Sequence, residues 1–209
     1  MNWYLLHIPP LSISLYEKWY HLLPPQKKLR ADSCHFEEDK RRLVFADMLA
    51  KLALSDYTGC LAESICFALR PNGKPYAIEI PAEFNISHSG DLVVCAVDSE
   101  SVGIDIEKIC PIPTKLVYRV CSEQECRYVF GDAPPDAQNM LTDQLALERF
   151  YQIWTAKEAY SKYTGIGIIT DLRQIPASNA QIQTTIYGNY AISICCEHFL
   201  QSAGGLPVK

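Results

Sequence analysis

Asp105 and Glu107 are two carboxylates set one residue apart in the apolar run of residues 102–107. The run predicts a β-strand, and because alternate side chains of a strand point to one face, both carboxylates project together. Two like charges on a half-buried sheet repel one another, so a cation or a basic partner must offset their field. A hard divalent ion such as Mg²⁺, which also binds water and phosphate oxygens, would do so. The alternative is an edge strand that carries solvated acidic side chains.

A second polar pair lies on a predicted long helix, residues 143–163, which ends at Gly165. Glu158 and Lys162 are four residues apart in this helix and therefore share a face. The alternative here is an ordinary ion pair on a helix surface, worth only about 0.3–0.5 kcal/mol.

Basic residues gather in the first half of the chain, and they include Lys27, Arg30 and Arg42. They fit an anion site or, alternatively, a solvated face balanced by the acidic residues 37–39. His88 stands at a predicted strand end between two serines, which suits a phosphate contact. A lone histidine is more often structural, and that alternative also stays open.

Composition narrows the classes of function. The chain has 209 residues, 48% hydrophobic and 21% charged, which suits one globular unit or two small subdomains. The net charge of −5 argues against non-specific binding to nucleic acid or membrane. No long apolar run or leader pattern is present, and the nine cysteines lack metal-ligand spacing. We therefore expect a cytoplasmic protein with free thiols.

The pattern predicts an α+β fold made of two halves, residues 1–98 and 99–209. Each half has one long helix, residues 36–54 or 143–163, that packs on a small antiparallel sheet. This order suggests a pseudo-two-fold duplication with a ligand cleft between the halves. We expect the strand at 102–107 to pair with that at 92–97. Residues 182–187 and 190–196 form a hairpin, residues 108–130 form short helices with a capping box from Ser122 to Glu125, and residues 131–142 form a loop.

Four motifs in this order resemble the 4′-phosphopantetheinyl transferases of the surfactin-synthetase-activating type. They are Gly-Lys-Pro at 73–75, Phe-Asn-Ile-Ser-His-Ser at 84–89, Gly-Ile-Asp-Ile-Glu at 103–107, and Trp-Thr-Ala-Lys-Glu-Ala at 154–159 with Lys162. The resemblance covers nearly the whole chain. The spacing from Asp105 to Glu158 is long for the family, and we place the excess in residues 131–142.

The resemblance implies transfer of the phosphopantetheine arm of coenzyme A to a serine of an apo acyl or peptidyl carrier protein, with release of adenosine 3′,5′-bisphosphate. By matching positions, Asp105, Glu107 and Glu158 would hold Mg²⁺ on the pyrophosphate, and Glu158 would accept the serine proton. Lys162 and Lys157 would stabilise the negative charge of the phosphates. The coenzyme A contacts in the first half would come from Lys27, Arg30, Arg42, Lys74, Pro75, Ser87 and His88.

This chemistry fits the residues, because breaking a phosphoanhydride needs a metal, cations for the developing charge and a base. Two alternatives remain: a Mg²⁺-dependent hydrolase of coenzyme A or a nucleotide pyrophosphate, and a non-enzymatic carrier-protein-binding module. A monomer is expected, since the two halves of one chain could form the cleft.

Overall fold

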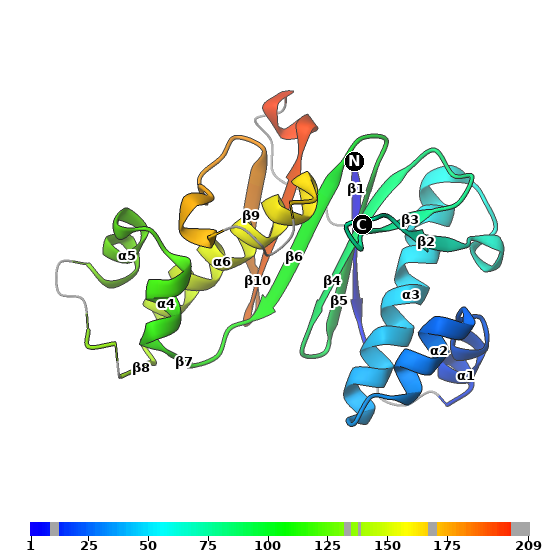
Figure 1. Ribbon diagram of the computed structural model, residues 1–209, viewed down its shortest axis with the longest axis horizontal. Helices are drawn as coiled ribbons and strands as arrows, with labels where there is room; N and C mark the ends of the chain where they lie inside the picture. Colours follow the sequence, from blue (N-terminus) through cyan, green and yellow to red (C-terminus); the bar gives the residue numbers. More distant parts are fainter. Residues whose placement is uncertain (9–12, 132–134, 138, 167–170, 202–209) are drawn as a thin grey trace. The chain divides into compact units, whose positions relative to one another are not determined.

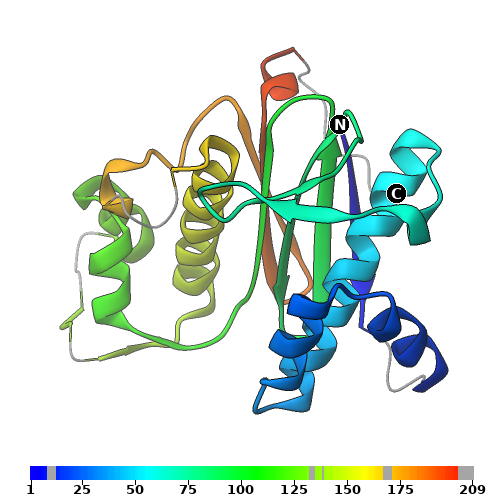
Figure 2. The same ribbon diagram turned by 45° about the vertical axis from the view of Figure 1, so that its right-hand side comes forward.

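A computed structural model describes residues 1–8, 13–131, 135–137, 139–166 and 171–201. The chain divides into two compact units, the first spanning Met1–Glu100 and the second starting at Ser101. Each unit is described by itself below, and both are drawn in Figures 1 and 2. The predicted division after residue 98 lies two residues before this one.

The first unit is a three-stranded antiparallel sheet covered by one long helix. The strand order is β1 (Asn2–His7), β5 (Leu92–Asp98), β4 (Glu83–Ser89), and every residue of the central strand β5 is buried. Helix α3 (Glu37–Thr58) packs on this sheet and ends at Gly59, whose φ of 80° is the left-handed conformation that glycine adopts at no steric cost. The smaller elements are α1 (Ile13–His21), α2 (Pro25–Asp32), η1 (Ala62–Ser64) and the pair β2 (Phe67–Leu69) and β3 (Pro75–Ala77).

The second unit has the same plan. Its sheet has the order β6 (Val102–Lys108), β10 (Tyr190–Cys196), β9 (Ile182–Tyr187), and helix α6 (Gln144–Thr164) lies against it (Figure 1). Asp143 caps the start of α6 by accepting a hydrogen bond from the amide of Ala146, and Gly165 ends it. The other elements are β7 (Ile112–Pro113), α4 (Thr114–Val120), α5 (Glu123–Phe130), β8 (Met140–Leu141), η2 (Leu172–Gln174) and η3 (Glu197–Gln201).

Connectivity repeats between the two units. In each three-stranded sheet, the first strand pairs with the last, and the last pairs with the one before it. The α-helices of each unit lie between the first strand of this sheet and its other two strands in the chain. The predicted mixed fold, with long helices on small antiparallel sheets, is therefore confirmed. One expected pairing was wrong: β6 forms its ladder with β10 rather than with residues 92–97, because the final hairpin supplies a fully buried apolar strand.

Two predictions from local sequence patterns are confirmed, the capping box at Ser122 and the turn between β9 and β10. The capping box is present: Ser122 accepts from the amide of Glu125, and Glu125 accepts from the amide of Ser122. The turn at 188–189 joins β9 and β10 as predicted. Part of the expected loop at 131–142 lies outside the described residues, and its end forms β8, which pairs with β7. Among the helices of the described residues, none is long and apolar enough to cross a membrane.

Candidate active site

Gly103 lets helix α6 lie directly on strand β6. A Cβ atom at this position would overlap the carbonyl oxygen of Ala159 and would lie 2.6 Å from the amide nitrogen of Tyr163. Since alternate residues of a strand share a face, Asp105 and Glu107 lie on the same side as Gly103, towards α6. The glycine therefore sets how closely the helix approaches the two carboxylates.

The cation nearest to the strand carboxylates is Lys162. Its ammonium lies 2.6 Å from Oδ1 of Asp105 and donates a second hydrogen bond to the carbonyl of Ile104, at 3.2 Å. Asp105 is only 4% exposed, whereas Lys162 is half-buried. A pair formed in this setting is charge-assisted and little screened by water. The structure thus joins a strand residue and a helix residue that the sequence treated as separate motifs.

Glu158 is half-buried one helical turn before Lys162. Burial raises the pKa of its carboxyl, the negative charge of Asp105 raises it further, and the charge of Lys162 opposes both. The carboxylates of Glu158 and Asp105 therefore interact, as a shared site requires. Glu107, also half-buried, lies on the same strand face as Asp105. Burial is the main cause of the raised pKa of Tyr151, and the charge of Glu107 makes a small contribution to it.

The coordination of Mg²⁺ by Asp105, Glu107 and Glu158 remains a prediction. Within the described ranges, no three His, Cys, Asp or Glu side chains are gathered so that they could hold a metal ion as they stand. The donor set nevertheless suits Mg²⁺, because it consists of carboxylate oxygens on one strand face and one helix. The raised pKa of Glu158 also reports mutual repulsion between carboxylates, which a cation would relieve.

Lys157 lies in the interior of the second unit. Its side chain is fully buried, and its ammonium donates to the carbonyls of Val120 and Leu172, both at 2.9 Å, and to Oε2 of Glu125 at 2.6 Å. Successive helical residues point about 100° apart, so Lys157 cannot share the face of Glu158. In this structure the lysine holds α5 and η2 against α6, and its predicted contact with phosphate charge stays a prediction.

In the first unit, two of the predicted basic residues have carboxylate partners. Lys27 pairs with buried Asp47, and its ammonium lies 4.9 Å from the centre of the Phe67 ring. Arg42 pairs with Asp39 and donates at 3.1 Å to the carbonyl of Gly90. The structure thus brings Arg42 to the turn that follows His88.

The other predicted coenzyme A contacts of the first unit are differently exposed. Arg30 in α2 and His88 near the end of β4 are exposed, and Ser87 is half-buried. Lys74 is half-buried before β3, which starts at Pro75, and burial is the main cause of its lowered pKa.

No role was predicted for Thr155, Ser193 or Tyr151. The hydroxyls of Thr155 and Ser193 are 2.7 Å apart in the interior, and the phenol of Tyr151 lies 3.2 Å from the thiol of Cys110. The close approach at Gly103 had one available signal in the sequence, because a glycine within a strand often marks a place where another backbone comes near. The hydroxyl pair has no local signal, because its members are 38 residues apart.

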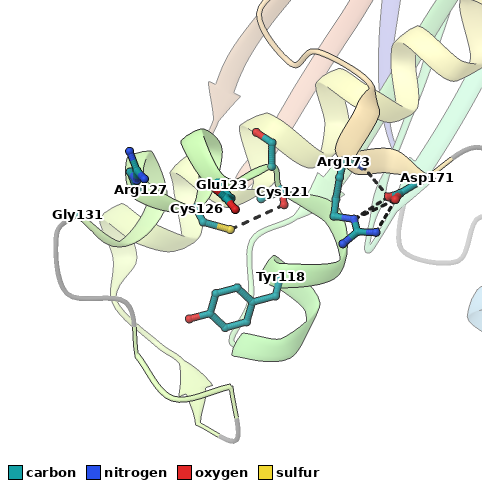
Figure 3. Close-up of a pocket in the computed structure, with 9 residues that line it drawn as sticks. Tyr118, Cys121, Glu123, Cys126, Arg127, Gly131, Asp171 and Arg173 are labelled. Carbon is teal, nitrogen blue, oxygen red and sulfur yellow. Dashed lines mark hydrogen bonds and ion pairs between the residues drawn. The ribbon is translucent and has the colours of Figure 1, made fainter.

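A separate cavity of about 710 Å³ opens in the second unit between α4, α5 and residues 171–173 (Figure 3). Asp171 and Arg173 form a two-pronged ion pair on its wall, and the guanidinium lowers the pKa of Asp171 to about 2. None of the predicted site residues lines this cavity, whose lining residues are Tyr118, Cys121, Ser122, Glu123, Cys126, Arg127, Gly131, Asp171 and Arg173.

Comparison with known proteins assigns the family. A family model described as the 4′-phosphopantetheinyl transferase superfamily matches residues 101–205, and one described as 4′-phosphopantetheinyl transferase, N-terminal, matches residues 12–100. The chain therefore belongs to the 4′-phosphopantetheinyl transferase superfamily, as its motifs predicted.

Individual relatives agree with this class. The chain is 33% identical to 4′-phosphopantetheinyl transferase Sfp of Bacillus subtilis over 160 residues, which are 76% of this chain and 67% of the relative. It is also 33% identical to 4′-phosphopantetheinyl transferase psf-1 of Bacillus pumilus over 182 residues, 85% of this chain and 74% of that protein. By this relationship the protein is an enzyme of the 4′-phosphopantetheinyl transferase class.

Proposed function

We propose that this protein transfers the 4′-phosphopantetheine group of coenzyme A to a serine hydroxyl of an apo acyl or peptidyl carrier protein. The reaction releases adenosine 3′,5′-bisphosphate and depends on Mg²⁺. The observation that carries the proposal is the set formed by Asp105, Glu158 and Lys162, in which two acidic side chains and one cation meet between β6 and α6. The family relationship supplies the class of reaction.

Asp105, Glu107 and Glu158 would hold the magnesium ion. When bound, the ion would offset the charge of the coenzyme A pyrophosphate. Lys162, which in this structure is held by Asp105, is a flexible cation that can turn from the carboxylate to a phosphate oxygen. It would then offset the charge that develops when the phosphoanhydride bond breaks.

Glu158 would accept the proton of the attacking serine. Burial and the charge of Asp105 raise the pKa of its carboxyl, and a base with a higher pKa accepts a proton more readily. The side chain is half-buried, so it keeps access to an incoming hydroxyl.

The 3′-phosphate of coenzyme A would be bound in the first unit by Lys27, Arg30, Arg42, Ser87 and His88. The adenine would be contacted by Lys74 and Pro75. Residues 1–98 would thus bind the nucleotide while residues 99–209 carry the chemistry. The same proposal includes a pseudo-two-fold relation of the halves and a ligand cleft between them. It also includes a monomeric state and a cytoplasmic location.

The test is the intact mass of an apo carrier protein after incubation with this enzyme, coenzyme A and Mg²⁺, with a chelator as control. A gain of about 340 Da that the chelator abolishes is the result expected for a metal-assisted transfer of one phosphopantetheine group. Free phosphopantetheine beside unmodified carrier protein would instead indicate a hydrolase. Binding of coenzyme A with no product from several carrier types would indicate a binding module.

A further inference from the structure

A row of polar side chains crosses the sheet of the second unit beneath α6. Ser193 of β10 is the direct cross-strand partner of Asp105 on β6 and of Thr184 on β9. Direct partners in an antiparallel sheet point to the same face. The row therefore runs from the candidate active site under the helix to the far edge of the sheet.

Three hydroxyls of this region form a hydrogen-bonded chain. Thr155 of α6 lies 2.7 Å from Ser193, and Ser193 lies 2.7 Å from Thr184. Thr155 also donates to the carbonyl of Tyr151, at 2.9 Å. Since a hydroxyl has one proton, Thr155 must accept from Ser193, and Ser193 must accept from Thr184. The chain thus has one direction, from Thr184 through Ser193 and Thr155 to the backbone of α6.

The bond between Thr155 and Ser193 is a strong constraint because both side chains are fully buried. Loss of Thr155 would leave the buried hydroxyl proton of Ser193 without its acceptor, and loss of Ser193 would leave Thr155 bonded only within its own helix. A threonine that only bonds back to the carbonyl four residues earlier is common in helices and carries no tertiary information. Thr155 differs from that case because it also bonds to the sheet.

Thr155 is placed to control the active face of the helix. Glu158 and Lys162 follow it by three and seven residues, which puts all three near one face of α6. The second constraint on this face is the contact between Gly103 and the carbonyl of Ala159. The glycine fixes how near the helix lies, and the hydroxyl bond fixes its position along and around its own axis.

We propose that Thr155 and Ser193 are positioning residues that set α6, and through it Glu158 and Lys162, in register with Asp105. The proposal rests on the proposed function only for its kinetic consequence. A small displacement of catalytic groups lowers turnover more than substrate binding, and a shift of 1 Å can reduce turnover about 100-fold.

The decisive variant is Thr155→Val, which keeps the shape of the side chain and removes the hydroxyl. We expect kcat for carrier-protein modification to fall at least about tenfold while KM for coenzyme A changes less than about threefold. Thr155→Ser should restore kcat to within about threefold of the original enzyme, because it restores the hydroxyl. Ser193→Ala should reproduce the loss from the strand side, and it decides the matter if Thr155→Val does not fold.

Two controls separate positioning from general stability. Thr164→Val removes the same kind of helix bond, from Thr164 to the carbonyl of Tyr160 at 3.0 Å, from the exposed end of α6. Ile192→Val trims a fully buried residue on the opposite face of β10 and lowers stability without touching the hydroxyls. Both should keep kcat. A loss of kcat in either control that matches Thr155→Val would overturn the proposal, as would unchanged kcat in Thr155→Val.

Hydrogen exchange of the metal-free and coenzyme-free protein gives a readout that does not depend on catalysis. Amides 156–163 should exchange about tenfold faster in Thr155→Val than in Thr164→Val, since the former loses its bond to the sheet. If the unchanged protein modifies no carrier, the proposed function fails and this exchange experiment alone judges the positioning role. Equal exchange of the two variants in α6 would then refute it.

Discussion

At the scale of single residues, the proposed chemistry would depend on how Asp105, Glu158 and Lys162 share their charges. Asp105 is almost completely buried and is held by Lys162, while Glu158 is half-buried with a raised pKa. A buried carboxylate that kept no cation would be costly, so the lysine stabilises the site in the absence of ligands. The same lysine can move to substrate once another cation takes its place beside Asp105.

Glu158→Gln tests the role of this carboxylate in turnover. We expect kcat to fall at least about 100-fold, because an amide can neither accept a proton nor act as an anionic ligand. The circular dichroism spectrum should stay close to that of the original enzyme. Glu148→Gln is the matched control, since Glu148 lies on the same helix and accepts a hydrogen bond from Gln144. Turnover retained in Glu158→Gln would remove the residue from the mechanism.

The pKa of Glu158 predicts a pH dependence of stability in the metal-free protein. Its pKa is raised in the folded state, so the folded chain binds this proton more tightly than the unfolded chain does. The stabilising contribution is complete below the ordinary pKa of a glutamate and is lost as pH rises through the folded value. Denaturant unfolding from about pH 4 to 7 should therefore show the original protein losing stability relative to Glu158→Gln. A difference that grows in the opposite direction would contradict the sign.

At the scale of elements, the active site depends on how α6 is seated on its sheet. Gly103 removes the side chain that would separate helix from strand, and Thr155 bonds to Ser193 across the same interface. Lys157 extends the packing to the other side of the helix, where it joins α5 and η2. One helix therefore carries both the catalytic candidates and the contacts that hold them in place.

Gly103→Ala should damage the seat of α6. The new methyl group would overlap backbone atoms that cannot turn away, so we expect a loss of about 3 kcal/mol in the free energy of unfolding together with reduced kcat. Gly131→Ala is the comparison: its φ of 72° is strained for alanine, but no atom lies within 4 Å. That variant should lose about 1–3 kcal/mol and keep its kcat. Similar kcat values for the two variants would show that the close approach does not matter for catalysis.

Lys157→Met tests whether this lysine holds α5 and η2 against α6. Removing the ammonium takes away the hydrogen bonds that Lys157 donates to Glu125 and two carbonyls, and breaking such a buried pair should cost about 3 kcal/mol in denaturant unfolding. Lys115→Met, on the exposed surface of α4, should change stability by less than about 0.5 kcal/mol. A Lys157 variant of undiminished stability with a raised KM for coenzyme A would return the residue to the phosphate-binding set.

At the scale of the whole molecule, two units with the same connectivity would have different tasks. The first unit has cationic side chains on its helices and His88 on β4. The second unit has the carboxylates of β6 and the candidate catalytic residues of α6. This division predicts that changes in the first unit affect coenzyme A binding and that changes in the second affect turnover.

His88→Ala tests this division. If the imidazole contacts a phosphate, its loss should raise KM for coenzyme A about tenfold and leave kcat within about threefold, as for a binding contact made equally in the ground and transition states. His35→Ala removes another exposed histidine of the same unit and should change neither constant. An unchanged KM in His88→Ala would exclude the predicted contact.

The sequence by itself determined the local features of this protein. Periodicity and capping residues indicated α6, the final hairpin and the capping box at Ser122, and alternation in β6 put Asp105 and Glu107 on one face. Ordered motifs indicated the family. These features depend on residues close in the chain, whose geometry is fixed by helix and strand periods.

Only the tertiary structure decided which side chains meet. It joined Lys162 to Asp105, turned Lys157 into the interior, buried Lys74 in part, and paired β6 with β10. The bond between Thr155 and Ser193 arises in the same way. Periodicity states which face a residue occupies, but the partner opposite that face comes from distant segments packed by burial of apolar surface, and no local pattern records it.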